Sequence, residues 1–217
     1  MINKPPLITL PELVLAWGRG WSVSRGLPEP VEVPGGFRAD VGVHGHRVRY
    51  VLHAWDTNLI EALAQQATEP GTWIKVTGSA TDLRSALPAA WTMDSAGYLM
   101  SAPLTVCADA RPTPYEIQIT TKGEVVVATV VDMAGATAAS GRLAPAGNCA
   151  VIDQVETAPA HRRRGLGTTI MRALSNHAAR AGLDTGILVA TADGRGLYHA
   201  LGWTVRSEIA AAYVRED

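Results

Sequence analysis

The sequence predicts an α/β fold in which helices flank a mixed β-sheet. Of the 217 residues, 47% are hydrophobic and 18% are charged, a composition typical of globular domains with a sizeable core. Residues 115–217 alternate between strand-like and helix-like segments, which is the pattern of an α/β sheet. Residues 1–107 show a weaker version of this alternation and are expected to form a smaller α+β domain.

The N-terminal half is expected to begin with a short helix at residues 11–17, which Gly18 and Gly20 end. Alternating residues then predict a hairpin, and a later periodicity of 3.6 predicts further helices. The expected elements are strands 37–43 and 47–52, helix 58–67, strand 73–76 and helix 82–87. Five of the six tryptophans lie in this half, and one or two of them are candidates to line a substrate pocket: Trp17, Trp21, Trp55, Trp73 and Trp91.

Residues 108–114 contain Pro112 and Pro114 and are expected to be a linker between the two domains. Beyond it, β-branched residues predict a hairpin, and apolar periodicity predicts two helices. The expected elements are strands 115–120, 124–131 and 149–156, helix 168–181, strand 187–190, helix 196–201, and strands 203–206 and 209–214. The small residues of 134–147 are left unassigned.

Charge and cysteine content exclude several classes of protein. A formal net charge of −1 argues against a general nucleic-acid binder, which is usually strongly basic. Neither Cys107 nor Cys149 lies in a metal-ligand spacing, so no metal is expected; two free thiols are favoured, with one disulfide as the alternative. The N-terminus has no apolar signal core and no segment is apolar enough to span a membrane. We therefore expect a cytoplasmic protein.

A basic, glycine-containing loop, Arg162-Arg163-Arg164-Gly165-Leu166-Gly167, lies between a strand and a long helix. The first turn of a helix has unpaired N–H groups and a partial positive charge, which together favour phosphate. Gly165 and Gly167 let the backbone approach phosphate oxygens, and Thr168 is a candidate to cap the helix or to donate to phosphate. By itself, the same pattern also fits an ordinary glycine turn next to a solvated run of arginines.

The surrounding sequence resembles the GCN5-related N-acetyltransferase (GNAT) family over residues 115–217. Arg162, Gly165 and Gly167 match the family's cofactor loop, and the strand before it ends in Thr157-Ala158-Pro159, with threonine where valine is usual. Residues 187–190 resemble the family's next strand. Residues 197–203 are similar to its signature of Leu-Tyr, two residues and Leu-Gly-Phe, with Trp203 for phenylalanine. The resemblance implies a mostly antiparallel sheet and acetyl-CoA as cofactor.

The resemblance also implies roles for particular residues. The strand 153–157 would diverge from strand 187–190, and the pantetheine arm would pair in the gap with the backbone of Val155 and Thr157. The pyrophosphate would bind the amides of residues 163–168. The implied cofactor-binding residues are Val155, Glu156, Thr157, Arg162, Arg163, Arg164, Gly165, Leu166, Gly167 and Thr168.

Two residues are candidates for catalysis. Tyr198 matches the family's general acid, which would protonate the leaving thiolate. Asp153 is a candidate base acting through water, because alternation places it on one face with Val155 and Thr157 and opposite Glu156. Some family members carry a glutamate where this chain has Val151, so no base is carried over from the family.

The N-terminal half is expected to help form the acceptor site. The family has two helices between its first two strands, and residues 115–131 leave no room for them. A weak internal repeat lays residues 59–63 on 170–174 and residues 73–76 on 186–189, although Ala/Leu-rich helices also align by chance. The N-terminal copy has no phosphate loop, so only the C-terminal half is expected to bind coenzyme A.

Two functions remain open at this point. The first is an N-acetyltransferase that acts on a primary amine, in a small molecule or a peptide, by direct attack on the thioester. The second is a non-catalytic acyl-CoA-binding or regulatory module. Neither nucleic acid nor membrane is an expected partner, and both a monomer and a homodimer fit the sequence.

Overall fold

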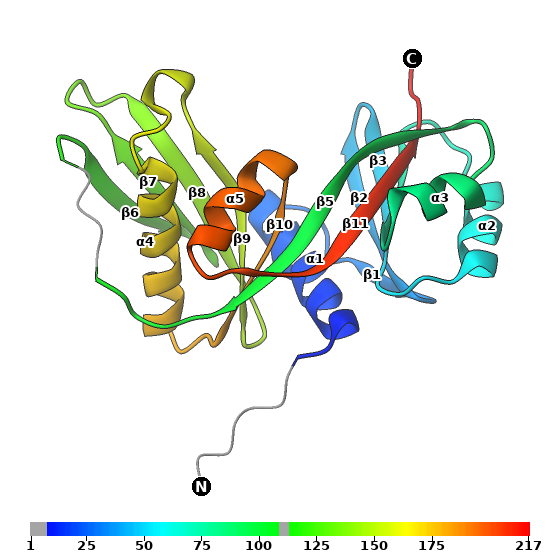
Figure 1. Ribbon diagram of the computed structural model, residues 1–217, viewed down its shortest axis with the longest axis horizontal. Coiled ribbons are helices and arrows are strands. Elements are labelled where there is room, and N and C mark those ends of the chain that lie inside the picture. Colours follow the sequence, from blue (N-terminus) through cyan, green and yellow to red (C-terminus); the bar gives the residue numbers. More distant parts are fainter. Residues whose placement is uncertain (1–7, 109–112) are drawn as a thin grey trace, which may run out of the picture.

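The computed structural model describes residues 8–108 and 113–217. The described strands form one twisted sheet in the order β1-β2-β3-β4-β11-β5-β10-β9-β8-β7-β6 (Figure 1). Its neighbours are antiparallel except for the pairs β3–β4 and β9–β10, so the predicted mixed, mostly antiparallel sheet flanked by helices is confirmed. Of the predicted linker, residues 109–112 lie outside the described residues.

The first half of the chain contributes helices to both faces of this sheet. Its elements are α1 (Leu10–Arg25), β1 (Val31–Val33), β2 (Gly36–Val43), β3 (His46–Leu52), α2 (Thr57–Gln66), β4 (Thr72–Thr77), α3 (Ala80–Ala86) and β5 (Trp91–Pro103). Strand β5 is the main element of this half that the sequence pattern did not reveal. Its side chains are mostly of intermediate exposure over its first part, so the apolar alternation of an amphipathic strand is weak there.

The second half contains β6 (Glu116–Lys122), β7 (Val125–Val131), β8 (Thr137–Ala146), β9 (Cys149–Thr157), the 3₁₀ turn η1 (Pro159–His161), α4 (Leu166–Arg180), β10 (Thr185–Ala190), α5 (Ala192–Ala200) and β11 (Thr204–Val214). The unassigned small residues form β8. They are small because α4 packs closely on them: a Cβ at Gly141 would lie 2.5 Å from Ile170 Cγ2. The two expected C-terminal strands form one irregular strand, β11.

The expected end of the first helix at Gly18 and Gly20 is wrong, because α1 continues to Arg25. Both glycines allow neighbouring side chains to contact the helix backbone. A Cβ at Gly18 would lie 2.4 Å from Phe37 Cζ, and one at Gly20 would lie 2.4 Å from Val151 Cγ2. Close packing therefore outweighs the low helix propensity of glycine at these two positions. The helix ends instead at Gly26, whose φ is +66°.

The two halves share the sheet by exchanging their last strands. β5 lies between β10 and β11, and β11 lies between β4 and β5. The order β3-α2-β4-α3-β5 in the first half matches β9-α4-β10-α5-β11 in the second, and each half contains one parallel pair. The segments aligned in the weak repeat lie on corresponding elements. The predicted domain division at 108–114 is thus not a division of the sheet.

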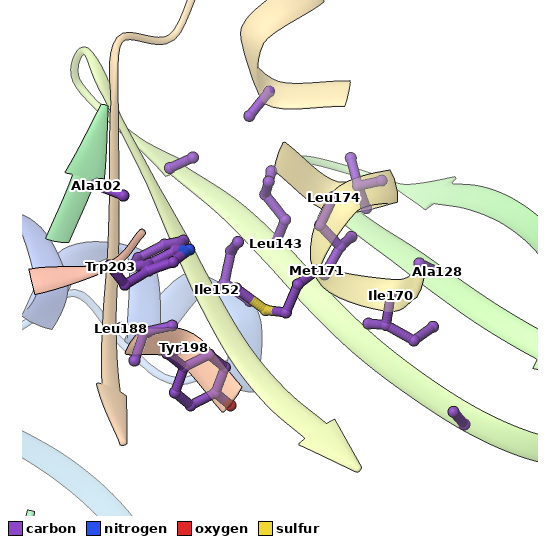
Figure 2. Close-up of a cluster of buried hydrophobic side chains, with 14 of the residues drawn as sticks. Ala102, Ala128, Leu143, Ile152, Ile170, Met171, Leu174, Leu188, Tyr198 and Trp203 are labelled. Atoms are coloured by element: carbon purple, nitrogen blue, oxygen red, sulfur yellow. The ribbon is translucent and has the colours of Figure 1, made fainter. Parts of the chain in front are cut away.

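Three apolar clusters fix this arrangement. On one face, Ile170, Met171 and Leu174 of α4 pack on Leu143 and Ile152 (Figure 2). On the opposite face, Leu13, Trp17 and Trp21 of α1 pack on Val151 and Ile187. A third cluster lies between α2, α3 and the first half's strands. Helices α4 and α1 therefore enclose strands β9 and β10 from opposite sides (Figure 1).

Candidate functional site

Strands β9 and β10 pair over a short stretch and then diverge, as the family resemblance implied. Their parallel pairing joins Cys149 to Thr185, Ala150 to Gly186 and Val151 to Ile187 and goes no further. The rest of β9 pairs with β8, and the rest of β10 pairs with β5. The corresponding strands β3 and β4 stay paired over five positions. A gap in the middle of the sheet is thus a property of the second half.

A cavity of about 960 Å³ lies along this gap on the side of α4 and α5. Such a volume is large enough for an extended organic ligand. Nine of the ten predicted cofactor-binding residues line it: Val155, Glu156, Thr157, Arg162, Arg163, Gly165, Leu166, Gly167 and Thr168. The other side of the cavity is formed by α5 and the residue before it, through Thr191, Asp193, Gly194, Gly196 and Leu197.

The loop before α4 presents backbone amides to this cavity. Arg163 and Gly165 adopt left-handed conformations, with φ of +63° and +77°. Gly165 is the N-cap of α4, and no side chain caps the helix. The first-turn amides therefore keep their affinity for an anion. Thr168 lies inside the first turn, so the interpretation of Thr168 as the helix cap is wrong.

Helix α2, the counterpart of α4 in the first half, has a different N-terminus. The Asp56 carboxylate accepts a hydrogen bond from the Leu59 amide at 3.1 Å. A carboxylate thus already occupies the position that a phosphate would take.

The three arginines of the loop have different surroundings. Arg162 and Arg163 line the cavity, and Arg162 Nε donates to the Thr157 carbonyl at 3.3 Å. Arg164 does not line the cavity: its Nη1 donates to the Tyr115 hydroxyl at 2.8 Å. That hydroxyl lies 3.0 Å from His161 Nδ1. For Arg164, only the backbone amide remains a candidate for binding the cofactor.

Tyr198 lies on α5 beside the cavity and not among its lining residues. Its side chain is 9% exposed and packs beside Trp203, with ring centroids 6.4 Å apart (Figure 2). Burial, and to a lesser extent the charge of Asp153, raises the pKa of Tyr198 to about 12. The phenol therefore stays protonated at neutral pH, as a general acid requires.

The predicted common face of Asp153 and Val155 is wrong. Gln154 has φ of +52°, and the pairing of β9 with β8 shifts register at this point, which is a β-bulge. Val155 consequently packs with the α4 cluster, whereas Asp153 faces α1. There its carboxylate accepts hydrogen bonds from Arg25 Nε at 2.5 Å and from Arg25 Nη2 at 3.0 Å.

A second cavity, of about 170 Å³, lies on the α1 side of the diverging strands. Its lining comes from both halves of the chain: Trp17, Trp21, Arg25, Arg49, Lys75, Asp153, Val189 and Ile209. The sequence pointed to the tryptophans as pocket candidates, but not to Arg49 and Lys75. One sequence signal could have identified Arg49 and Lys75. Each is a charged residue at a position of its strand, β3 or β4, that faces α1 and would ordinarily be apolar.

The fold and the cleft are those of a known family of acetyltransferases. Residues 82–203 match the acetyltransferase (GNAT) family model, which covers more than half of the chain, so the chain belongs to this family. The match begins at α3 and includes β5, before the predicted start of the second domain.

Solved structures share the fold over nearly the whole chain. A GCN5-related N-acetyltransferase from Kribbella flavida has a TM-score of 0.67 at 12% identity, covering 94% of this chain and 96% of its own. A GNAT-family protein described as a putative acetyltransferase from Novosphingobium aromaticivorans has a TM-score of 0.62 at 18% identity, covering 95% and 99%. None of the curated proteins matches the sequence. At these identities, the likeness is one of fold.

Neither a metal centre nor a membrane-spanning helix is found among the described residues. Within 8–108 and 113–217, no group of histidine, cysteine and carboxylate side chains is arranged to hold a metal ion. Within the same residues, no helix combines the length and the apolar character needed to cross a membrane.

Proposed function

We propose that the chain transfers an acetyl group from acetyl-CoA to a primary amine by direct attack on the thioester. The observation that carries the proposal is the uncapped N-terminus of α4 at one end of a large cleft along the diverging strands β9 and β10. A second cavity, lined by Asp153 of β9 and Val189 of β10, lies on the α1 side of the same strands. One side of the sheet then holds the acyl donor, and the other side holds the amine. Residues 163–168 would bind the pyrophosphate through backbone amides.

Backbone groups of Val155 and Thr157 would hold the pantetheine arm. Both residues line the large cavity where β9 has left β10, so their strand edge is not used by that neighbour. An extended arm can pair with such an edge as an added strand does. The thioester would then lie at the divergence of the two strands, where each cavity is within reach.

Tyr198 would donate its proton to the departing sulfur, because its raised pKa keeps the phenol protonated. Asp153 would accept the amine's proton through water, from the opposite side of the sheet. Its ion pair with Arg25 orients the carboxylate and also competes with this role. We regard small-molecule and peptide amines as candidate acceptors and expect a cytoplasmic monomer or homodimer that binds neither nucleic acid nor membrane.

A non-catalytic acyl-CoA-binding module is the second candidate. It is favoured by the ion pair that occupies Asp153 and by the position of Tyr198 outside the cleft lining. In either case we expect one cofactor site, because β3 and β4 stay paired and Asp56 caps α2.

Two assays on the full chain separate the candidates. Isothermal titration with coenzyme A measures binding, and release of free thiol from acetyl-CoA measures turnover across a broad amine panel. Binding with turnover supports the acetyltransferase. Binding without turnover on any amine supports the module, and absence of binding contradicts both.

A further inference from the structure

We propose that the cavity on the α1 side binds a carboxylate through Arg49 and Lys75, and that the acetylated amine belongs to a small aminocarboxylate. The second part rests on the proposed function, whereas the carboxylate site stands on its own geometry. The cavity borders the divergence of β9 and β10 through Asp153 and Val189. A molecule bound there therefore lies next to the gap through which the thioester would be reached.

The walls of this cavity come from strands of both halves and from one helix. Trp17 and Trp21 of α1 stack with ring centroids 5.7 Å apart, and both are 5% exposed. Arg49 of β3 and Lys75 of β4 lie across the sheet from the diverging strands. The site thus has an aromatic wall, a basic end and an end at the gap, with a volume of about 170 Å³.

Arg49 is a buried charge without a carboxylate partner among the described residues. It is 9% exposed, and its guanidinium stacks on the Trp21 ring at 4.3 Å. Its hydrogen-bond partner is His46, whose Nε2 lies 3.0 Å from Nε and 2.7 Å from Nη2. Among the ion pairs of residues 8–108 and 113–217, none involves Arg49 or Lys75. Buried arginines are usually paired, so this arrangement favours an anion from outside the chain.

His46 supplies no compensating charge. Burial, followed by the charges of Arg49 and Lys75, lowers its pKa to about 3, so the imidazole is neutral and acts as an acceptor. Burial, followed by the charge of Arg49, lowers the pKa of Lys75 to about 8, and Asp94 partly opposes this shift. Burial, followed by the charge of Arg25, lowers the pKa of Arg49 to about 10, and Asp153 and Asp94 partly oppose it. Both side chains therefore carry most of their positive charge at pH 7.

The carboxylates near the site do not balance its basic side chains. Asp153 lines the cavity but forms a bidentate pair with Arg25. Asp94 of β5 pairs with Ala211 of β11, and Ala211 pairs in turn with Lys75 of β4. Asp94 is therefore two strands away from Lys75. It does not line the cavity. Because Asp153 pairs with Arg25, the positive charges of Arg49 and Lys75 are opposed by the more distant Asp94. A small bound anion would supply the missing negative charge.

Three features favour a carboxylate on an amine over other anions. The planar guanidinium of Arg49 matches a planar carboxylate. The two indoles, Val189 and Ile209 give the small cavity apolar walls that suit a short hydrocarbon part. The carboxylate of Asp153, at the gap, can accept a hydrogen bond from an amine in addition to those from Arg25. An amine at the gap and a carboxylate at Arg49 fit one molecule of amino-acid size.

The test uses the full chain with coenzyme A present and matched probes that differ by one carboxylate. α-Amino acids and β-alanine are compared with the amines obtained from them by decarboxylation, and aminoalkyl phosphates form a third arm. Binding is measured by calorimetry and by the fluorescence of the cavity tryptophans. We expect at least one aminocarboxylate to bind at least tenfold more tightly than its decarboxylated partner. Equal binding within every pair, or preference for the phosphate arm, would overturn the proposal.

Variants then locate the site. Arg49→Gln and, independently, Lys75→Gln should each reduce the carboxylate preference at least fivefold, so loss of folding in one variant still leaves the other informative. Arg38→Gln is the matched control, because Arg38 lies on the neighbouring strand β2, pairs with Asp40 and does not line the cavity. Unchanged preference in a folded Arg49 or Lys75 variant would contradict the assignment.

The carboxylate site and the proposed acetyl transfer can fail independently of each other. If no amine is acetylated but the carboxylate preference and its loss in the variants are found, the carboxylate site stands and the proposed reaction fails. If amines are acetylated with equal efficiency whether or not they carry a carboxylate, the reaction stands and the assignment of the acceptor as an aminocarboxylate fails.

Discussion

Arg25, in the last turn of α1, forms a bidentate ion pair with Asp153, the last residue of β9 before its bulge. The two nitrogen–oxygen distances are 2.5 Å and 3.0 Å, and Ser24 Oγ adds a third hydrogen bond at 3.3 Å. This pair connects the first helix of the chain to the strand that forms the cleft 128 residues later. The N-terminal half thus contributes directly to the α1 side of the site.

The ion pair can be tested by a double-mutant cycle. Arg25→Gln and Asp153→Asn should show a coupling of about 0.5–1 kcal/mol in urea unfolding, since the pair is partly exposed. If Asp153 is the base, Asp153→Asn should also lower kcat/KM more than about tenfold and remove the acidic limb of its pH profile, whereas Arg25→Gln should retain that limb. Equal effects of both variants on turnover would assign Asp153 a purely structural role.

Gly165→Glu should reduce coenzyme A affinity by about 100-fold or more, because a carboxylate next to a pyrophosphate repels it strongly. Gly147→Glu is the matched control. Both glycines have positive φ, +77° and +59°, and a Cβ added at either position would meet open space, so backbone strain is comparable. Calorimetry with coenzyme A measures the difference. If both variants lost coenzyme A affinity to the same extent, the loop at Gly165 would not be the pyrophosphate site.

Tyr198→Phe should lower kcat about 100-fold while leaving the coenzyme A affinity within about twofold, because only proton donation is lost. With a pKa near 12, Tyr198 stays protonated through about pH 10, so the wild-type profile should show no alkaline decline caused by this residue below that pH. Tyr213→Phe, on β11 in a stack with Trp73, is the control. Wild-type turnover in the Tyr198 variant would exclude the acid role.

Gly18→Ala should destabilise the fold by about 1–3 kcal/mol, because the added methyl would overlap the Phe37 ring. The cost should shrink in a Phe37→Leu background, where the outer ring atoms are absent. Unfolding in urea of the four proteins of the cycle measures this. An unchanged cost in both backgrounds would mean that the helix glycine is not required by contact with Phe37.

His46 should make the protein less stable in acid. Its pKa is lowered from 6.5 to about 3 on folding, so the unfolded chain binds a proton that the folded chain does not between these values. The stability that the folded state gains by holding His46 neutral is fully present above pH 6.5 and is lost as the pH falls toward 3. His46→Asn should therefore flatten the decline in unfolding free energy between about pH 6.5 and 4.5. A decline as steep as in the wild type would show that other groups cause it.

Most helices and strands of the second half follow from local pattern, since apolar periodicity and terminating glycines report directly on burial along one segment. The glycine loop before α4 was equally readable, because the conformation of Gly165 and the uncapped first turn of α4 depend on the backbone of adjacent residues. Two expectations failed where long-range packing decided the outcome. In the first, Gly18 and Gly20 lie inside a helix because Phe37 and Val151 need the space.

The bulge at Gln154 was the second failure. Strict alternation placed Asp153 and Val155 on one face, and a single extra residue in the pairing with β8 moved them to opposite faces. No short sequence window contains that information, because it depends on the register of another strand.

The sequence by itself determined the glycine loop that borders the large cavity, since that loop is built from consecutive residues between β9 and α4. Only the tertiary structure decided the α1 side of the gap. Arg49, Lys75 and Asp153 are far apart along the chain and come together because β5 and β11 join the two halves into one sheet. The exchange of strands and their pairing register depend on the total apolar area that the two faces of the sheet bury. A short stretch of sequence does not contain that information.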